Sequence, residues 1–363
     1  MSSNKIVHGG DIYQSSRKTG IAPEEIIDFS GNINPFGITQ GLKDHICRSL
    51  DAIGHYPDME YRELKKAIAE FTGCSPDQVI VGNGGTELIS LIFKALSPKK
   101  ALIPSPTYSE YERDLYLLGK EANPYRIKEE LDFRIDGKGL AEELANGYDT
   151  LILCNPNNPT GKLIARDELF QVLDFAREKK ITILADETYM EFTDDADAST
   201  MINDLSNYKN IIILRGFSKF FAVPGIRLGY CITDTSIVSL MERFKEPWTV
   251  NSIADIAGIY LARDAEYIRK SREWVHRERT FLYERLRSFK SLKVYSTDAN
   301  FFLVKILDPG LSAALLKDRL ENMGLLIRDL SGYYYLDKSF FRVAVHTHEN
   351  NIRLIEALGK ILA

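Results

Sequence analysis

The sequence predicts an α/β protein in which helices cover both faces of a mostly parallel sheet, with a smaller α+β domain after it. Between about residues 40 and 250, short continuous apolar runs alternate with amphipathic helical segments. Continuous apolar strands separated by helices are typical of a parallel sheet buried on both faces. Several runs are followed directly by Gly, Asn, Asp or Lys motifs. Because ligands bind at the carboxyl ends of such strands, this pattern also predicts a ligand site there.

Each predicted element follows from its local pattern. Runs rich in Ile, Val and Leu predict strands at residues 78–82, 101–104, 150–154, 181–185 and 210–214. Amphipathic periodicity predicts helices over residues 62–71, 86–96, 109–118 and 166–179, and a long charged helix over 254–289. The remainder predicts strands near residues 294, 301–306, 325–328 and 341–345, with helices over 310–321 and 348–362. We therefore expect an N-terminal arm (1–40), a large domain (41–253), an interdomain helix (254–290) and a small C-terminal domain (291–363).

Composition narrows the classes of function. The 363 residues carry a net charge of −5, so no basic surface for nucleic acid is indicated. The four cysteines are far apart and form no C-x-x-C pair, which predicts neither a zinc site nor a disulfide framework. No apolar run approaches the ~20 residues that span a bilayer, and no apolar leader segment is present. We expect a cytoplasmic protein that binds neither nucleic acid nor membrane.

The strongest candidate for catalysis lies in the stretch Arg215 to Tyr230, RGFSKFFAVPGIRLGY. Lys219 lies between Ser218 and two phenylalanines after a predicted strand, and Arg227 follows eight positions later. Burial among aromatic side chains favours a neutral amine, which can bond covalently to an aldehyde. A hydroxyl and a guanidinium are suited to hold phosphate. An aldehyde that carries a phosphate suggests pyridoxal 5′-phosphate; the alternative is a lysine whose stem covers apolar surface.

Residues 82–87, GNGGTE, connect a predicted strand to a predicted helix. Glycines let the backbone approach an anion, and a helix N-terminus offers free N–H groups. The dinucleotide pattern G-x-G-x-x-G fails, because position 87 is Glu. The motif is either a phosphate-binding turn or an ordinary tight turn between strand and helix.

Residues 155–161, NPNNPTG, directly follow another predicted strand. Two Asn-Pro steps favour an extended, turning backbone whose amide side chains point outward. A plain loop could use one such step, but two at the carboxyl end of a strand favour a functional loop.

Asp186 ends the next strand, within the motif ADETY. An acid on an apolar run needs a partner to remain ionised. A protonated pyridine nitrogen is such a partner, and it makes the cofactor an electron sink. Tyr189 could donate to the phenolic oxygen of the same ring. The alternative is an aspartate that caps the following helix.

Two further residues are candidates on weaker grounds. Tyr108 follows a predicted strand and could stack on the ring, although a core tyrosine is equally ordinary. Arg342 is a cation on an apolar strand, which indicates a salt bridge or a carboxylate ligand. His346 and His348 form an H-x-H pair without supporting ligands, so no metal site is expected.

Together these residues resemble one known family, the fold-type I pyridoxal-phosphate enzymes of the class I/II aminotransferase kind. The resemblance rests on NPNNPTG, ADETY, SKFFAVPGIRLGY and Arg342, and it covers nearly the whole chain. It implies that Lys219 would bind the cofactor covalently and move protons, while Asp186 would pair with the pyridine nitrogen. The other implied cofactor contacts are Asn158 and Tyr189 at the phenolic oxygen, Tyr108 on the ring, and Gly85, Thr86, Ser218 and Arg227 at the phosphate.

The resemblance also implies a homodimer and a site for a small phosphorylated amino acid. Tyr56, in the motif HYPD, resembles a tyrosine that reaches the cofactor phosphate of the neighbouring subunit. The N-terminal arm, HGGDIYQSSRKTGIAPEEIIDFSGNINPFG, resembles that of the threonine-phosphate decarboxylases within this family. The residues implied to bind substrate are His8, Gly9 and Asn32 in the arm, Arg328 at the phosphate, and Arg342 at the carboxylate.

The implied reaction is decarboxylation of L-threonine O-3-phosphate to (R)-1-amino-2-propanol O-2-phosphate in cobalamin biosynthesis, with L-serine O-phosphate as an alternative substrate. The rival is a histidinol-phosphate aminotransferase that uses 2-oxoglutarate, and Tyr108 and Tyr189 match that group. At Gly216 relatives usually carry Ser or Thr, so one hydroxyl contact to the cofactor phosphate is expected to be missing. A regulator of the same fold is not expected, because the arm is too short for a DNA-binding domain.

Overall fold

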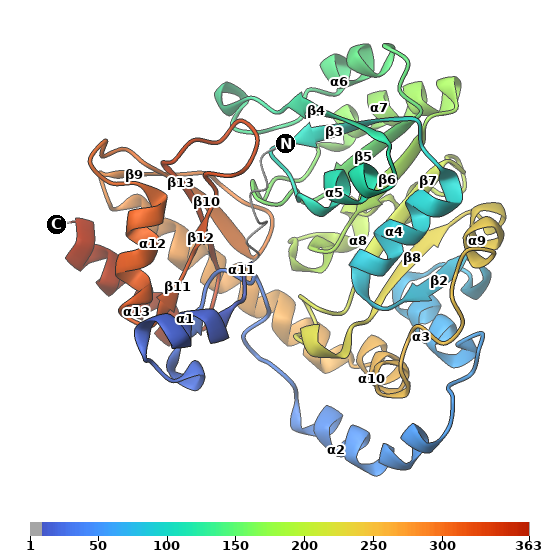
Figure 1. The fold of residues 1–363 in the computed structure, drawn as a ribbon, viewed down its shortest axis with the longest axis horizontal. Coiled ribbons are helices and arrows are strands. Elements are labelled where there is room, and N and C mark those ends of the chain that lie inside the picture. Colours follow the sequence, from blue (N-terminus) through green and yellow to red (C-terminus); the bar gives the residue numbers. More distant parts are fainter. Residues whose placement is uncertain (1–8, 363) are drawn as a thin grey trace.

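A seven-stranded sheet forms the larger layer of the protein (Figure 1). The structure, a computed structural model, describes residues 9–362. The strand order is β2-β8-β7-β6-β5-β3-β4, and only β8 runs antiparallel to its neighbours. The predicted mostly parallel sheet is therefore confirmed. Its strands are β2 (Val79–Gly82), β3 (Lys100–Ser105), β4 (Glu121–Arg126), β5 (Thr150–Cys154), β6 (Thr182–Asp186), β7 (Ile211–Gly216) and β8 (Gly229–Thr233).

Helices cover both faces of this sheet because alternate residues of its strands point to opposite sides. In β6, Ile183 belongs to one apolar cluster and Leu184 to the other. The cluster around Leu184 includes α4 (Gly84–Leu96), α5 (Glu110–Leu117) and α9 (Thr235–Glu242). The cluster around Ile183 includes α2 (Gln40–Arg48), α3 (Arg62–Thr72), α6 (Gly137–Leu144), α7 (Arg166–Lys179) and α10 (Ser252–Ala262).

A four-stranded antiparallel sheet forms the smaller layer, in the order β12-β13-β10-β9. Figure 1 shows it on the left with its two helices, and α11 (Ala265–Arg287) extends from it toward the larger layer. The elements are β9 (Leu292–Val294), β10 (Phe301–Ile306), β12 (Arg328–Asp329), β13 (Phe340–Ala344), α12 (Ala313–Glu321) and α13 (His348–Leu362).

The N-terminal segment folds against the smaller layer. Its helix α1 (Ile12–Thr19) places Lys18 at 2.7 Å from carboxylates of both Asp318 and Glu321 on α12. Its strand β1 (Ile27–Asp28) pairs in parallel with β11 (Leu325–Leu326). Within the described residues, helix α1 and strand β1 therefore hold the arm against the smaller layer.

Three sequence expectations are corrected. The predicted helix over 254–289 is two helices, because Asp264 caps the start of α11 by accepting from the Tyr267 N–H at 3.0 Å. The predicted strand over 325–328 is split: β11 pairs with the arm, whereas β12 pairs with β13. Strand β4 was not predicted, because it is a half-exposed edge strand that contains Pro124 and lacks an apolar run. The domain boundaries stay predictions.

Within residues 9–362, none of the helices combines the length and apolar character needed to cross a membrane.

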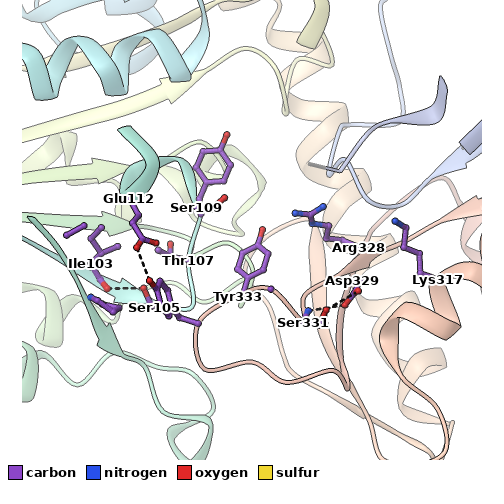
Figure 2. Close-up of a pocket in the computed structure, with 15 residues that line it drawn as sticks. Ile103, Ser105, Thr107, Ser109, Glu112, Lys317, Arg328, Asp329, Ser331 and Tyr333 are labelled. Carbon is purple, nitrogen blue, oxygen red and sulfur yellow. Dashed lines mark hydrogen bonds between the residues drawn. The ribbon is translucent and has the colours of Figure 1, made fainter. Parts of the chain in front are cut away.

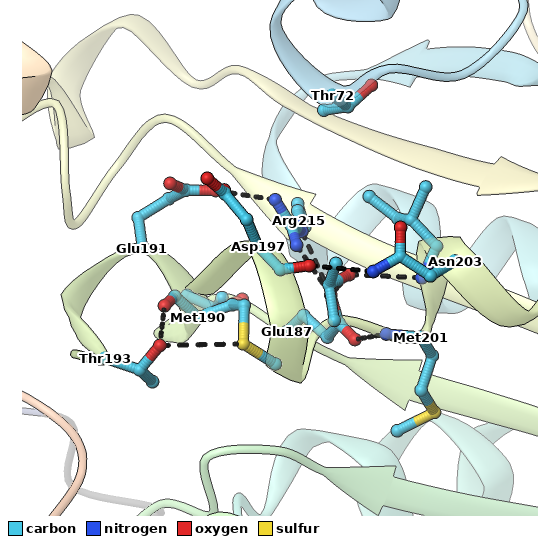
Figure 3. Close-up of polar contacts among 12 residues, drawn as sticks. Thr72, Glu187, Met190, Glu191, Thr193, Asp197, Met201, Asn203 and Arg215 are labelled. Carbon is cyan, nitrogen blue, oxygen red and sulfur yellow. Dashed lines mark hydrogen bonds and ion pairs between the residues drawn. The ribbon is translucent and has the colours of Figure 1, made fainter. Parts of the chain in front are cut away.

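A buried ion network joins β7 to the residues that follow β6 (Figure 3). Arg215 donates through Nη2 to Glu187 at 2.8 Å and through Nη1 to Glu191 at 2.6 Å. All three side chains are nearly inaccessible to solvent. Glu187 also accepts from the Thr200 hydroxyl, and Arg272 of α11 donates to Glu191, both at 2.7 Å. The network therefore holds two adjacent strand ends and α11 in one arrangement.

Replacing Arg215 by Ala leaves Glu187 as a buried carboxylate without a cation. We expect the free energy of unfolding to fall by about 3–5 kcal/mol, which urea denaturation followed by circular dichroism would measure. The matched control is Arg269→Ala, which removes an exposed pair with Glu273 and should change stability by less than about 1 kcal/mol. Equal urea midpoints for the two variants would contradict the importance of the network.

Candidate active site

A cavity of about 280 Å³ lies where strands β3, β5, β6 and β7 end. Its wall combines residues of both sheets with the N-terminal segment. Most of the residues singled out from the sequence line it, although they come from distant parts of the chain. They are Gly9, Gly85, Thr86, Tyr108, Asn158, Asp186, Tyr189, Ser218, Lys219, Arg227, Arg328 and Arg342.

Lys219 holds its amine inside this cavity. The Nζ atom donates to the backbone oxygen of Gly31 at 2.7 Å, so the N-terminal segment fixes the direction of the side chain. Burial of the amine, together with the positive charges of Arg342 and Arg227, lowers the pKa of Lys219 to about 8. A substantial fraction of the amine is therefore uncharged near neutral pH and available as a nucleophile or base.

Asp186 faces the cavity from the end of β6. Its carboxylate accepts from the Tyr111 hydroxyl at 2.5 Å and from the Thr188 N–H and hydroxyl at 2.9 and 2.6 Å. Burial raises the pKa of Asp186, and these three bonds only partly oppose the shift. Among residues 9–362, no cationic side chain lies within 4.0 Å of the carboxylate. A cationic N–H donor in the cavity would therefore favour its ionised form.

A cradle for an anion forms where α4 begins. Gly84 has a φ of 76°, and a Cβ built there would lie 2.4 Å from Nη2 of Arg227. Glycine is thus required for the guanidinium to approach the first turn of α4, where free N–H groups face outward. Thr86 and Ser218 place hydroxyls on the same cavity wall.

Arg342 is a buried cation that has no carboxylate partner among residues 9–362. Its Nη2 donates to the backbone oxygen of Ser30 at 2.6 Å, and its Nη1 donates to Oδ1 of Asn158. Its Nε has no hydrogen-bond partner among the described residues. Burial lowers the pKa of Arg342. An anion that enters the cavity would offset this unpaired buried charge.

This donor set fits pyridoxal 5′-phosphate. Lys219 can bond to the aldehyde, Asp186 can pair with the ring nitrogen, and the cradle around Gly84 can hold the phosphate. The Nδ2 atom of Asn158 and the hydroxyl of Tyr189 are suited to the phenolic oxygen, because Arg342 already occupies Oδ1 of Asn158.

Two residues predicted for a site do not line this cavity, and a third is not described; Tyr56 was expected at the cavity of the neighbouring subunit. Tyr56 is 78% exposed, outside the cavity, and its ring stacks on Trp248 with centroids 4.5 Å apart. Asn32 is fully buried behind the cavity wall, and its Nδ2 donates to the Tyr189 hydroxyl at 3.3 Å. His8 lies outside the described residues.

The structure adds residues that the sequence did not single out. Tyr111 and Thr188 hold the carboxylate of Asp186, and Gly31 accepts from Lys219. Tyr111 lies in the first turn of α5, and its ring meets that of Tyr108 edge to face with centroids 5.5 Å apart. No local signal marks Gly31, since only its backbone oxygen takes part.

Comparison with known proteins agrees with this geometry. The family profile described as "Aminotransferase class I and II" matches residues 24–358. A protein of Caldanaerobacter subterraneus, provisionally named threonine-phosphate decarboxylase, is 42% identical and covers 97% of this chain and 92% of its own. The threonine-phosphate decarboxylase of Salmonella typhimurium is 33% identical, with coverage of 98% and 96%.

A solved structure gives the same result for the fold. The histidinol-phosphate aminotransferase of Clostridium acetobutylicum superposes with a TM-score of 0.87 at 34% identity, over 92% of this chain and 98% of its own. The profile and the relatives span nearly the whole chain. The chain is therefore an enzyme of the class I and II aminotransferase family, with the fold-type I architecture of pyridoxal-phosphate enzymes.

Proposed function

We propose that the enzyme decarboxylates L-threonine O-3-phosphate to (R)-1-amino-2-propanol O-2-phosphate, a step of cobalamin biosynthesis, with pyridoxal 5′-phosphate as cofactor. The observation that carries the proposal is that one cavity is lined by several positively charged side chains. Lys219 and three arginines line it, and none of the four pairs with a carboxylate within residues 9–362. Two relatives named for this reaction, at 42% and 33% identity, support the same conclusion.

The cations match the anionic groups that this reaction brings together. The substrate carries a carboxylate and a phosphate, and the cofactor carries a second phosphate. Arg342 is the buried cation suited to the carboxylate, Arg328 is its cross-strand partner on β12 and is suited to the substrate phosphate, and Arg227 belongs to the cradle at α4. Phosphate recognition by arginine gains from charge-assisted, bidentate hydrogen bonds.

Decarboxylation breaks the bond between Cα and the carboxylate carbon, releases CO₂ and adds a proton to Cα. The cofactor, when bound, supplies a sink for the electrons of the broken bond. Lys219 supplies the proton from Nζ, whose lowered pKa allows exchange near neutral pH. Arg342 would fix the direction of the carboxylate, and Asp186 would pair with the ring nitrogen of the cofactor.

A second candidate is a histidinol-phosphate aminotransferase, which the structural likeness to the Clostridium enzyme favours. That reaction requires a keto acid for turnover, whereas decarboxylation does not. The need for 2-oxoglutarate therefore separates the two functions.

The test supplies cofactor-loaded enzyme with L-threonine O-phosphate and no keto acid, and measures CO₂. We expect sustained release, slower release from L-serine O-phosphate, and none from Lys219→Ala. Removing one methyl should lower kcat/KM by about tenfold or more, within the ~1–3 kcal/mol that a methyl contributes in a pocket. Absence of CO₂, with glutamate formed from histidinol phosphate and 2-oxoglutarate, would establish the aminotransferase instead.

The pH dependence of cofactor capture tests the state of Lys219. Only the uncharged amine attacks an aldehyde, so the capture rate should rise with pH and level off above a midpoint near 8. A lysine at its ordinary pKa of 10.5 would give a rate still rising at pH 10. Stopped-flow absorbance of the apo-protein mixed with pyridoxal 5′-phosphate measures this rate. A pH-independent rate between 7 and 9 would contradict the assignment.

We further propose a homodimer in which Tyr56 serves the cavity of the other subunit. Tyr56 does not line the cavity of its own chain. Residues 50–59 contain Tyr56, and residues 244–248 contain its stacking partner Trp248. Besides Tyr56, both segments expose large apolar side chains, and a group of such side chains on the surface indicates an interface. They are Leu50, Ile53, Met59, Phe244 and Trp248.

Subunit mixing tests this arrangement. Tyr56→Ala and Lys219→Ala should each be nearly inactive alone. In a mixed dimer, one site combines an intact Lys219 with the intact Tyr56 of the other subunit, so random mixing should restore about a quarter of the wild-type activity. No restoration, with dimers confirmed by sedimentation, would show that Tyr56 acts within its own chain or not at all.

A further inference from the structure

A second chamber, of about 370 Å³, adjoins the candidate active site (Figure 2). It lies between the β3–β4 edge of the larger sheet and the segment that follows β12. The two cavities share four lining residues: Tyr108, Ser109, Arg328 and Tyr333. Arg328 therefore faces both spaces.

A second cation lines the chamber together with Arg328. Lys317 lies on α12, which packs against β12, and it lines the chamber. In Figure 2 the labelled ends of Arg328 and Lys317 lie on the same side, with Tyr333 between Arg328 and Ser109. The Arg328 guanidinium lies 5.9 Å from the Tyr333 ring centroid, a contact that restrains its direction.

Neither cation forms an ion pair within the part of the chain that the structure describes, although the charge of Lys317 contributes, after Lys18, to lowering the pKa of Asp318. No carboxylate of residues 9–362 lies within 4.0 Å of Lys317 or Arg328. The two acids that line the chamber bond elsewhere: Glu112 accepts from the Tyr334 hydroxyl at 2.8 Å, and Asp329 accepts from the Ser331 N–H at 2.9 Å. Two cations that line one chamber without ion pairs would both attract a dianion that enters it.

From this geometry we infer that Lys317 and Arg328 together bind the phosphate of the substrate, and that Lys317 determines specificity for phosphorylated over unphosphorylated amino acids. The inference rests on the proposed function and extends it to a residue of α12. A phosphate monoester carries close to two negative charges near neutral pH, which matches two cations. The guanidinium supplies directional hydrogen bonds, whereas the ammonium acts as a compact charge.

The test compares cofactor-loaded Lys317→Ala with wild type by two measurements. Calorimetric titration with inorganic phosphate should show a Kd about tenfold higher, as expected for the loss of one charge-assisted bond. KM for L-threonine O-phosphate should rise by a similar factor, while the KM for L-threonine stays unchanged. Lys317→Arg keeps the charge and should restore most of both values.

The matched control is Arg319→Ala, which removes an exposed cation from the same helix without lining the chamber. Its phosphate affinity should equal that of wild type. An unchanged phosphate Kd in Lys317→Ala, or equal losses for L-threonine and its phosphate, would overturn the inference. Phosphate that binds without competing with substrate would also overturn it, as a separate site for free phosphate. If L-threonine O-phosphate is not turned over at all, the proposed function fails, while the phosphate titration still tests Lys317.

Discussion

The positions of the reactive groups depend on the buried contact between Arg215 and Glu187. Glu187 directly follows Asp186, and Arg215 lies four residues before Lys219. One ion pair therefore ties together the strand ends that carry the carboxylate and the amine. Thr200 and Glu191 complete the hydrogen bonds of this pair, so the desolvated charges are compensated within the network. The network thus fixes the two strand ends relative to each other beneath the cavity.

The floor of the site contrasts with its walls. Below the cavity, Arg215 is paired with Glu187 and Glu191; around it, Lys219 and three arginines form no ion pair with any residue from 9 to 362. Unpaired cations in a partly buried space raise the free energy of the empty folded state. Anionic ligands that bind only the folded protein lower it again by mass action. Binding energy and fold stability are thus coupled at this site, and the cationic walls are suited to anionic ligands such as those of the proposed reaction.

The fold could be predicted where sequence patterns were local. Continuous apolar strands such as β5 and β6 were recognisable, and so were motifs at their carboxyl ends, because both lie within a few residues. Strand β4 was missed because an exposed edge strand lacks that pattern. Neither the contact of Gly31 with Lys219 nor the phosphate-binding role proposed for Lys317 could be predicted from the sequence. Each depends on a tertiary contact, one through a backbone oxygen and the other through the packing of α12 on β12.

The short segment from Ile27 to Gly31 limits which insertions and deletions the N-terminal part of the chain can tolerate. At Ile27 it is held in register with β11 of the smaller layer, and at Gly31 its carbonyl meets the amine of Lys219. Between them, the backbone oxygen of Ser30 accepts from Arg342. Inserting or deleting one residue here would shift the carbonyl that each of these donors faces. The length of this stretch is therefore as constrained as the identity of any side chain in the site, even though loops elsewhere on the surface tolerate such changes.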